Sequence, residues 1–180
     1  MASATDAAFI AYHRRMERSA APKGTTAEPD VVVIGAGVAG LYQLHRLRGL
    51  GLRAKVFEAG TGVGGTWYWN RYPGARFDSE SWSYGYSFSE ELLQEWEWPE
   101  HFAAQPDTLR YLNHVADKFD LRRDICFGCR VAAAHFDEAD DRWTITLENG
   151  EQAKARLLIT ALGPLSAYTL PNIPGRESFR

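Results

Sequence analysis

The feature that most constrains this chain is a glycine-rich segment directly after a short apolar run. Residues 31–34 are all β-branched, and Gly35-Ala36-Gly37-Val38-Ala39-Gly40 follows them at once. A β-branched run of this kind is typical of a strand buried on both faces of a parallel sheet. Leucines at helical spacing continue to residue 50, so the pattern predicts a strand, a tight turn and a helix.

The three glycines of this G-x-G-x-x-G pattern each have a mechanical role. Gly35 makes the tight turn, Gly37 lets the backbone approach a pyrophosphate, and Gly40 lets the helix pack closely on the strand. The helix N-terminus offers unpaired N–H groups and a positive dipole end to phosphates. Glu58 ends the next predicted strand, eighteen residues after Gly40, where its carboxylate can accept hydrogen bonds from a ribose. Glu58 would repel a 2′-phosphate, so FAD or NAD is predicted here rather than NADP.

A second glycine cluster, Gly62-Val63-Gly64-Gly65, follows Glu58 and leads into aromatic residues at positions 67, 68, 69 and 72. Aromatic side chains can cover a large planar ligand while backbone amides bond its edges. The cluster therefore favours FAD. The alternative for part of these rings is that they only pack the domain, because large aromatic side chains dominate protein cores.

Composition excludes several classes of protein. A chain of 180 residues can bury one sizeable core but not two large domains. Its formal charge of -3 excludes a dominant electrostatic hold on nucleic acid. No apolar run approaches the roughly 20 residues of a membrane span. The first residues lack the apolar core of a secretory signal, so we expect a cytoplasmic protein with no membrane contact.

The cysteines and histidines predict no metal site. Cys126 and Cys129 form a lone C-x-x-C, and on one continuous strand their odd separation would point the thiols to opposite faces. We therefore expect neither metal nor redox use of this pair. Histidine ligand spacing and a G-x-S-x-G nucleophile motif are both missing from the sequence.

The remaining pattern predicts an α/β Rossmann-like domain with a helical excursion and a small antiparallel β-meander. Residues 1–28 are predicted as an N-terminal helix (7–19) with a linker, and residues 29–180 as the FAD-binding domain. Asn149-Gly150 is a strong hairpin turn signal. The other expected elements are an irregular stretch at 59–89, helices at 90–98 and 106–119, and β segments at 125–136, 142–148 and 152–160, the last returning to the parallel sheet at 156–160.

The chain resembles the FAD domain of Baeyer–Villiger monooxygenases, which are class B flavoprotein monooxygenases, and in particular the phenylacetone and steroid monooxygenase branch. The likeness is carried by Gly35–Gly40, Glu58, the segment 64–76 (GGTWYWNRYPGAR) and Asp78. It covers about residue 30 to the end, and WYWNRYPGAR is its most specific part. The resemblance implies the FAD-binding part of a flavoprotein with two dinucleotide domains.

The resemblance also implies a reaction. Family members bind FAD, reduce it with NADPH and add O₂ to give a flavin peroxide, which converts ketones to esters or lactones. Two alternatives stay open. One is a related enzyme that oxygenates nitrogen or sulfur, and the other is a flavin-binding module without catalysis of its own.

Site residues follow from the resemblance by motif. Asp78 is implied as the catalytic acid, beside the flavin and paired with an arginine of the NADP domain. Phe77 stands where this branch often has cysteine, which would make the surface facing the nicotinamide bulkier. Arg76, Phe77 and Asp78 are expected where NADP reaches the flavin. The implied FAD-binding residues are Gly35, Gly37, Ala39, Gly40, Glu58, Gly65, Thr66, Trp67, Tyr68, Trp69, Asp78, Tyr84 and Val131.

The NADP domain is not recognisable in these 180 residues, which contain no second nucleotide motif. Phe179-Arg180 look like the first two residues of the family fingerprint F-x-G-x-x-x-H-x-x-x-W. We therefore expect this chain to need a second polypeptide or segment for activity. Apolar surface should then be exposed around residues 157–174 unless a partner covers it.

Overall fold

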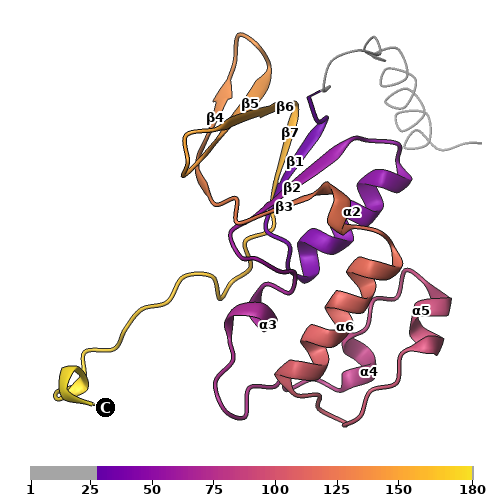
Figure 1. The fold of residues 1–180 in the computed structure, drawn as a ribbon, viewed down its shortest axis with the longest axis vertical. Helices are drawn as coiled ribbons and strands as arrows, with labels where there is room; N and C mark the ends of the chain where they lie inside the picture. Colours follow the sequence, from indigo (N-terminus) through magenta and orange to yellow (C-terminus); the bar gives the residue numbers. More distant parts are fainter. Residues whose placement is uncertain (1–27, 180) are drawn as a thin grey trace, which may run out of the picture.

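The centre of the molecule is a parallel sheet, seen in a computed structural model that describes residues 28–179 (Figure 1). The strand order is β3-β2-β1-β7, and Val33 of β1 pairs with Val56 of β2 and Ile159 of β7. Because β1 is hydrogen-bonded to β2 on one side and to β7 on the other, residues 31–33 lie in the middle of the sheet and are completely buried. This confirms the predicted parallel sheet. Its strands are β1 (Val31–Ile34), β2 (Ala54–Glu58), β3 (Ile125–Phe127) and β7 (Leu157–Thr160).

Successive side chains of β1 contribute to two different hydrophobic cores. Val31 and Val33 pack with the leucines of α2 (Val38–Gly49), whereas Val32 packs with Ile145 of the meander. Figure 1 shows α2 on one side of the sheet and the meander on the other. The meander consists of β4 (Val131–Asp137), β5 (Arg142–Leu147) and β6 (Gln152–Ala155) in antiparallel order.

The helical excursion lies between β2 and β3 along the chain. Its longest helix, α6, buries Tyr111, Leu112 and Val115 in the same core as α2. The two predicted helices are confirmed: the first ends three residues earlier than predicted, and the second has the predicted length but begins one residue earlier. The stretch predicted as irregular also contains two single helical turns, too short to give a periodic pattern. The helices are α3 (Thr66–Trp69), α4 (Ser81–Tyr84), α5 (Glu90–Glu95) and α6 (Gln105–Lys118).

The predicted β segment at 125–136 was wrong as a single element, because the chain changes sheets within it. The segment 125–136 divides into β3 and β4 at Gly128, which has φ +67°. The segment 152–160 divides into β6 and β7, and β7 confirms the predicted return to the parallel sheet at 156–160. The predicted hairpin is confirmed, with Gly150 at φ +87° between antiparallel β5 and β6.

The expectation that Cys126 and Cys129 point to opposite faces is also wrong. Their Cα atoms are 5.7 Å apart and the two residues form a disulfide. The expectation assumed one continuous strand, whereas the left-handed backbone of Gly128 turns the chain between the two cysteines.

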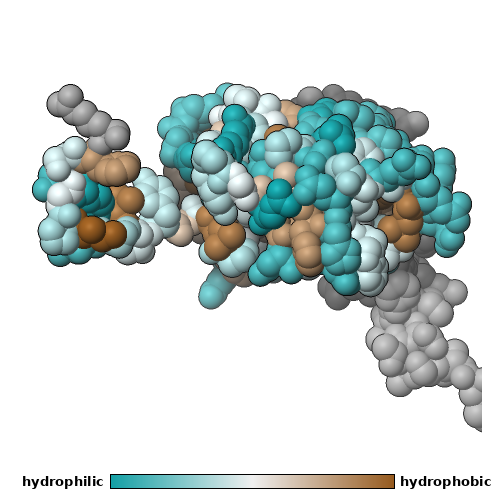
Figure 2. All heavy atoms as spheres, turned by 90° about the horizontal axis from the view of Figure 1, so that it is seen from below, coloured by the Kyte–Doolittle hydropathy of each residue, from teal (hydrophilic) through white to brown (hydrophobic). Residues whose placement is uncertain are grey.

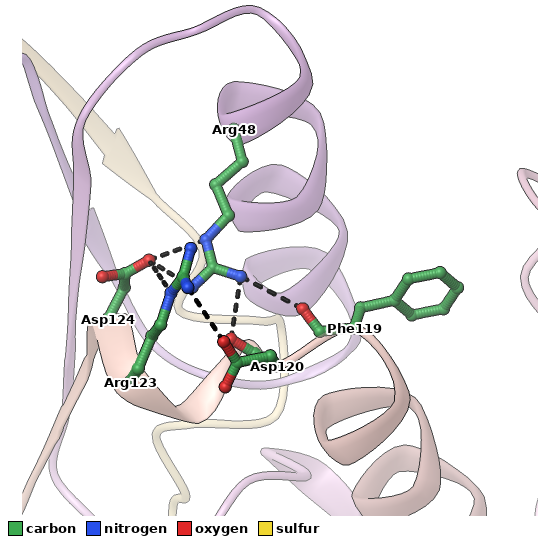
Figure 3. A network of polar contacts seen from close by, with 5 residues as sticks. All are labelled: Arg48, Phe119, Asp120, Arg123 and Asp124. Atoms are coloured by element: carbon green, nitrogen blue, oxygen red, sulfur yellow. Dashed lines mark hydrogen bonds and ion pairs between the residues drawn. The ribbon is translucent and has the colours of Figure 1, made fainter.

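Arg48, near the end of α2, joins this helix to the C-terminal end of α6 (Figure 3). Its Nη1 donates to the carbonyl oxygens of Phe119 (3.1 Å) and Asp120 (2.8 Å), and its Nε donates to Asp124 Oδ2 (2.6 Å). Asp120 has φ +48°, so the chain reverses here without a glycine. The guanidinium group thus satisfies two carbonyls at the turn after α6 and one carboxylate of the following 3₁₀ turn, Arg122–Asp124.

We predict that Arg48→Met lowers the free energy of unfolding by about 2 kcal/mol, because it leaves two carbonyls and a carboxylate without their charged donor. Arg46→Met is the matched control, since Arg46 is exposed in the last turn of the same helix. The control should change the free energy of unfolding by no more than about 0.5 kcal/mol in urea titrations. Equal effects of the two substitutions would contradict the assignment.

The segment after β7 leaves the body of the molecule (Figures 1 and 2). Figure 2 shows it standing apart with apolar side chains on its surface. Leu165, Tyr168 and Leu170 are 66%, 84% and 61% exposed, which confirms the apolar surface expected around 157–174. The predicted helix at 7–19 lies outside the described residues. Within residues 28–179, no helix is long and apolar enough to cross a membrane.

Candidate functional site: a cradle of two glycine clusters

The turn from β1 into α2 has the geometry that its glycines predict. Gly35 has φ +101°, and a Cβ placed on it would lie 2.7 Å from the carbonyl oxygen of Ala161. A Cβ on Gly40 would overlap the carbonyl oxygen of Gly35 and lie 2.9 Å from its carbonyl carbon. No side chain caps the N-terminus of α2, and its first turn contains no acidic residue. The helix therefore begins with backbone N–H groups suited to an anion.

The second glycine cluster packs directly on the first. The N–H of Gly64 donates to the carbonyl of Ala36 at 3.0 Å. A Cβ on Gly65 would lie 2.8 Å from Cα of Gly37, and one on Gly37 would lie 3.3 Å from Cα of Gly65. The sequence pattern assigned Gly37 a role toward pyrophosphate only. The structure adds that it allows two backbone segments to meet, which the shared glycine content of the clusters could have indicated.

Glu58 joins the two clusters through its side chain. It is only 5% exposed, and its two carboxylate oxygens accept from the N–H groups of Ala36 and Gly60, each at 2.7 Å. The carboxylate therefore holds the first glycine turn against the segment that follows β2. Each carboxylate oxygen can accept more than one hydrogen bond, so this arrangement leaves capacity for a ribose hydroxyl.

Part of the aromatic loop packs the domain rather than facing outward. Trp67 Nε1 donates to the hydroxyl of Tyr84 at 2.8 Å, and Phe77 stacks on Tyr84 with ring centroids 4.3 Å apart. Phe77 is only 6% exposed, so its ring is directed into the core and offers little surface to a nucleotide. In contrast, Trp69 and Tyr72 are 55% and 63% exposed. The loop thus contains both packing rings and rings available to a ligand.

Gln105, at the start of α6, holds this loop in two places and was not singled out from the sequence. Its side-chain amide donates to the carbonyl of Trp67, and its N–H donates to the carbonyl of Ala75 at 2.8 Å. The available signal was its place directly before Pro106, at the start of a predicted helix. An open groove of about 590 Å³ lies beside it, lined by Arg71, Gln105, Pro106, Leu109, Arg110 and Asn113.

The structure brings the glycines of both clusters together with Glu58, and α3 (Thr66–Trp69) begins at Gly65. Asp78 is exposed and directly follows the buried Phe77. Arg76 pairs with Glu100 at 2.8 Å. Val131 opens β4 and packs with the core on the meander side of the sheet.

This fold and this cradle define a Rossmann-like dinucleotide-binding domain. Residues 33–90 match a family described as an NAD(P)-binding Rossmann-like domain. A 2-oxo-Δ³-4,5,5-trimethylcyclopentenylacetyl-CoA monooxygenase of Pseudomonas putida is 51% identical over 151 residues, which are 84% of this chain and 28% of that protein. A Baeyer–Villiger monooxygenase of Pseudooceanicola batsensis is 45% identical over 159 residues, covering 88% and 29%.

Two further comparisons bear on cofactor and chemistry. A solved structure of OTEMO in complex with FAD and NADP superposes with a TM-score of 0.78 and 50% identity, covering 86% of this chain and 29% of that one. A phenazine N-monooxygenase of Lysobacter antibioticus is 47% identical over 152 residues, covering 84% and 28%. The chain is homologous to the FAD-binding N-terminal part of Baeyer–Villiger monooxygenases. It spans under a third of the length of these relatives.

Proposed function

We propose that this chain binds FAD as part of a Baeyer–Villiger-type monooxygenase, which uses NADPH and O₂ to convert ketones to esters or lactones. The observation that carries the proposal is the cradle itself. Two glycine clusters meet with no room for a side chain, next to the uncapped N-terminus of α2 and the buried carboxylate of Glu58. The relative whose structure contains both FAD and NADP supports the choice of cofactor.

The residues of this chain fit the requirements of FAD. The backbone of residues 35–40 and the start of α2 would hold the diphosphate, and Glu58 would accept from the hydroxyls of the adenosine ribose. Bound FAD supplies the redox chemistry. Asp78 would act beside the flavin as a carboxylate partner for an arginine that further chain provides. Arg76 and the backbone of Phe77 would lie where NADP approaches.

The exposed segment after β7 supports the proposal that activity requires a second polypeptide or segment. Large apolar side chains such as Leu165 and Tyr168 are mostly exposed, and they would be covered by a second polypeptide or segment carrying the NADP domain. A second candidate function is oxygenation of nitrogen, which the phenazine N-monooxygenase favours because its coverage and identity are comparable. The substrate is then decided by residues outside this chain.

The test is flavin binding by the 180-residue chain, followed by reduction. We expect the purified chain to take up FAD and show its absorbance bands. NADPH should bleach these bands only when a polypeptide carrying the NADP domain is added. A chain that takes up no FAD, alone or with that partner, would overturn the proposal. Bleaching by NADPH without the partner would overturn the requirement for further chain.

A further inference from the structure

Helix α3 turns back over the segment that follows Glu58. The hydroxyl of Tyr68 lies 2.7 Å from Oγ1 of Thr61 and accepts from the N–H of Thr61 at 3.2 Å. The Tyr68 ring lies against the glycines on both sides of Thr61. A Cβ on Gly60 would lie 2.8 Å from Cε1 of Tyr68, and one on Gly62 would lie 3.0 Å from Cε2. The Tyr68 side chain therefore contacts all three residues of the segment, Gly60 and Gly62 through ring carbons and Thr61 through the hydroxyl group.

The same segment holds the carboxylate of Glu58. The N–H of Gly60 donates to Oε1 of Glu58, and a Cβ on Gly60 would lie 3.2 Å from that oxygen. Gly60 therefore lies against both the Tyr68 ring and the carboxylate of Glu58, with the Trp69 ring also beside it. A shift of this segment would move the N–H that orients Oε1, while the other oxygen stays bonded to Ala36.

Tyr68 is itself anchored, although it is not part of a hydrophobic core. Its N–H donates to the carbonyl of Gly65 at 3.0 Å, and Nε of Arg71 donates to its carbonyl at 2.7 Å. The guanidinium group of Arg71 lies 4.8 Å from the ring centroid. Because the phenol is partly exposed, removing its oxygen leaves the two cores intact. The Thr61 hydrogen bonds are the main cause of a lowered pKa of the Tyr68 phenol.

We propose that Tyr68 and Thr61 form a clasp that positions Glu58 for the adenosine half of the dinucleotide. This inference rests on the proposed function, because it concerns how the same site recognises its ligand. Both are positioning residues, since the hydroxyl groups bond each other and act on the ligand through Gly60 and Glu58. The clasp thus gives Tyr68 a role distinct from direct contact with the flavin.

The test is a double-mutant cycle on the 180-residue chain, with ADP and FAD as probes. Tyr68→Phe removes the phenol oxygen, and Thr61→Val removes only the hydroxyl and keeps the backbone N–H. We expect each substitution to weaken ADP and FAD binding about tenfold, and the double variant to bind no more weakly than Tyr68→Phe. Thr61→Ser, in contrast to Thr61→Val, keeps a hydroxyl group at this position and should bind ADP and FAD as tightly as the unaltered chain. Tyr168→Phe is the matched control, because it removes the same oxygen from an exposed tyrosine of the segment after β7, which has no assigned part in holding FAD.

The results that would overturn the clasp differ from the result that would overturn the proposed function. The clasp is overturned if Tyr68→Phe binds ADP as tightly as the unaltered chain, or if the two losses add fully in the double variant. It is also overturned if the affinity loss is accompanied by a marked fall in the thermal unfolding midpoint, because the hydroxyl then has a purely structural role. Failure of the unaltered chain to bind ADP and FAD would overturn the proposed function itself.

Discussion

Gly40→Ala is expected to abolish FAD binding and to lower the free energy of unfolding by about 3 kcal/mol or more. The added methyl group would overlap the carbonyl oxygen of Gly35, which is backbone at the tight turn and cannot rotate away. Relief requires α2 to move from β1, and this movement would displace the helix N-terminus that we assign to the diphosphate. Urea unfolding and FAD titration measure the two effects separately.

Gly49→Ala is the control for this substitution, in the same helix. A Cβ on Gly49 meets no atom within 4 Å, so alanine should preserve FAD binding and raise the free energy of unfolding by up to about 1 kcal/mol. The two substitutions add the same methyl group and differ only in what it meets. Similar losses in both variants would show that close packing at Gly40 is not what the domain requires.

Glu58→Gln should weaken FAD binding strongly and lower the free energy of unfolding by about 1–3 kcal/mol. In the buried site both carboxylate oxygens accept from backbone N–H groups, those of Ala36 and Gly60. An amide presents one NH₂ group in place of an oxygen, so one of these N–H groups would face a donor and stay unsatisfied. The remaining oxygen cannot replace a carboxylate toward ribose hydroxyls.

The control is Glu148→Gln, which changes an exposed glutamate that pairs with Arg130 at 3.5 Å on the surface. A surface ion pair contributes little, so this variant should differ from the unaltered chain by less than about 1 kcal/mol and bind FAD equally well. The measurements are again urea unfolding and FAD titration. If Glu58→Gln behaves like this control, the carboxylate does not join the two glycine clusters as described.

The sequence predicts the first half of the domain well because each local signal agrees with the next. The apolar run at 31–34, the glycines and the spaced leucines all specify strand, turn and helix, and the structure has each of them. Hydrophobic periodicity does not predict strand boundaries that depend on tertiary contacts. Residues 125–136 were predicted as one β segment, although the chain passes from one sheet to the other at Gly128.

In the candidate site, too, local features could be predicted from the sequence and long-range contacts could not. The position of Glu58 at the end of β2 could be predicted from the sequence, but its two backbone partners could not, because they lie in separate loops. The inward packing of Phe77 against Tyr84 was equally hidden, since a ring in a glycine-rich loop has no period to show its direction. Gln105 acts on residues 38 and 30 positions before it in the chain, and such long-range pairs leave no local pattern.

The contact between Gly37 and Gly65 restricts how this domain can be recombined with related ones. Each residue occupies the space that a side chain on the other would need. Replacing either segment by one with a larger residue at position 37 or 65 would therefore prevent the two segments from packing, even if the opposite segment is unchanged. In chimeric flavoproteins built from this chain and a relative, residues 35–40 and 62–65 should therefore come from the same parent protein.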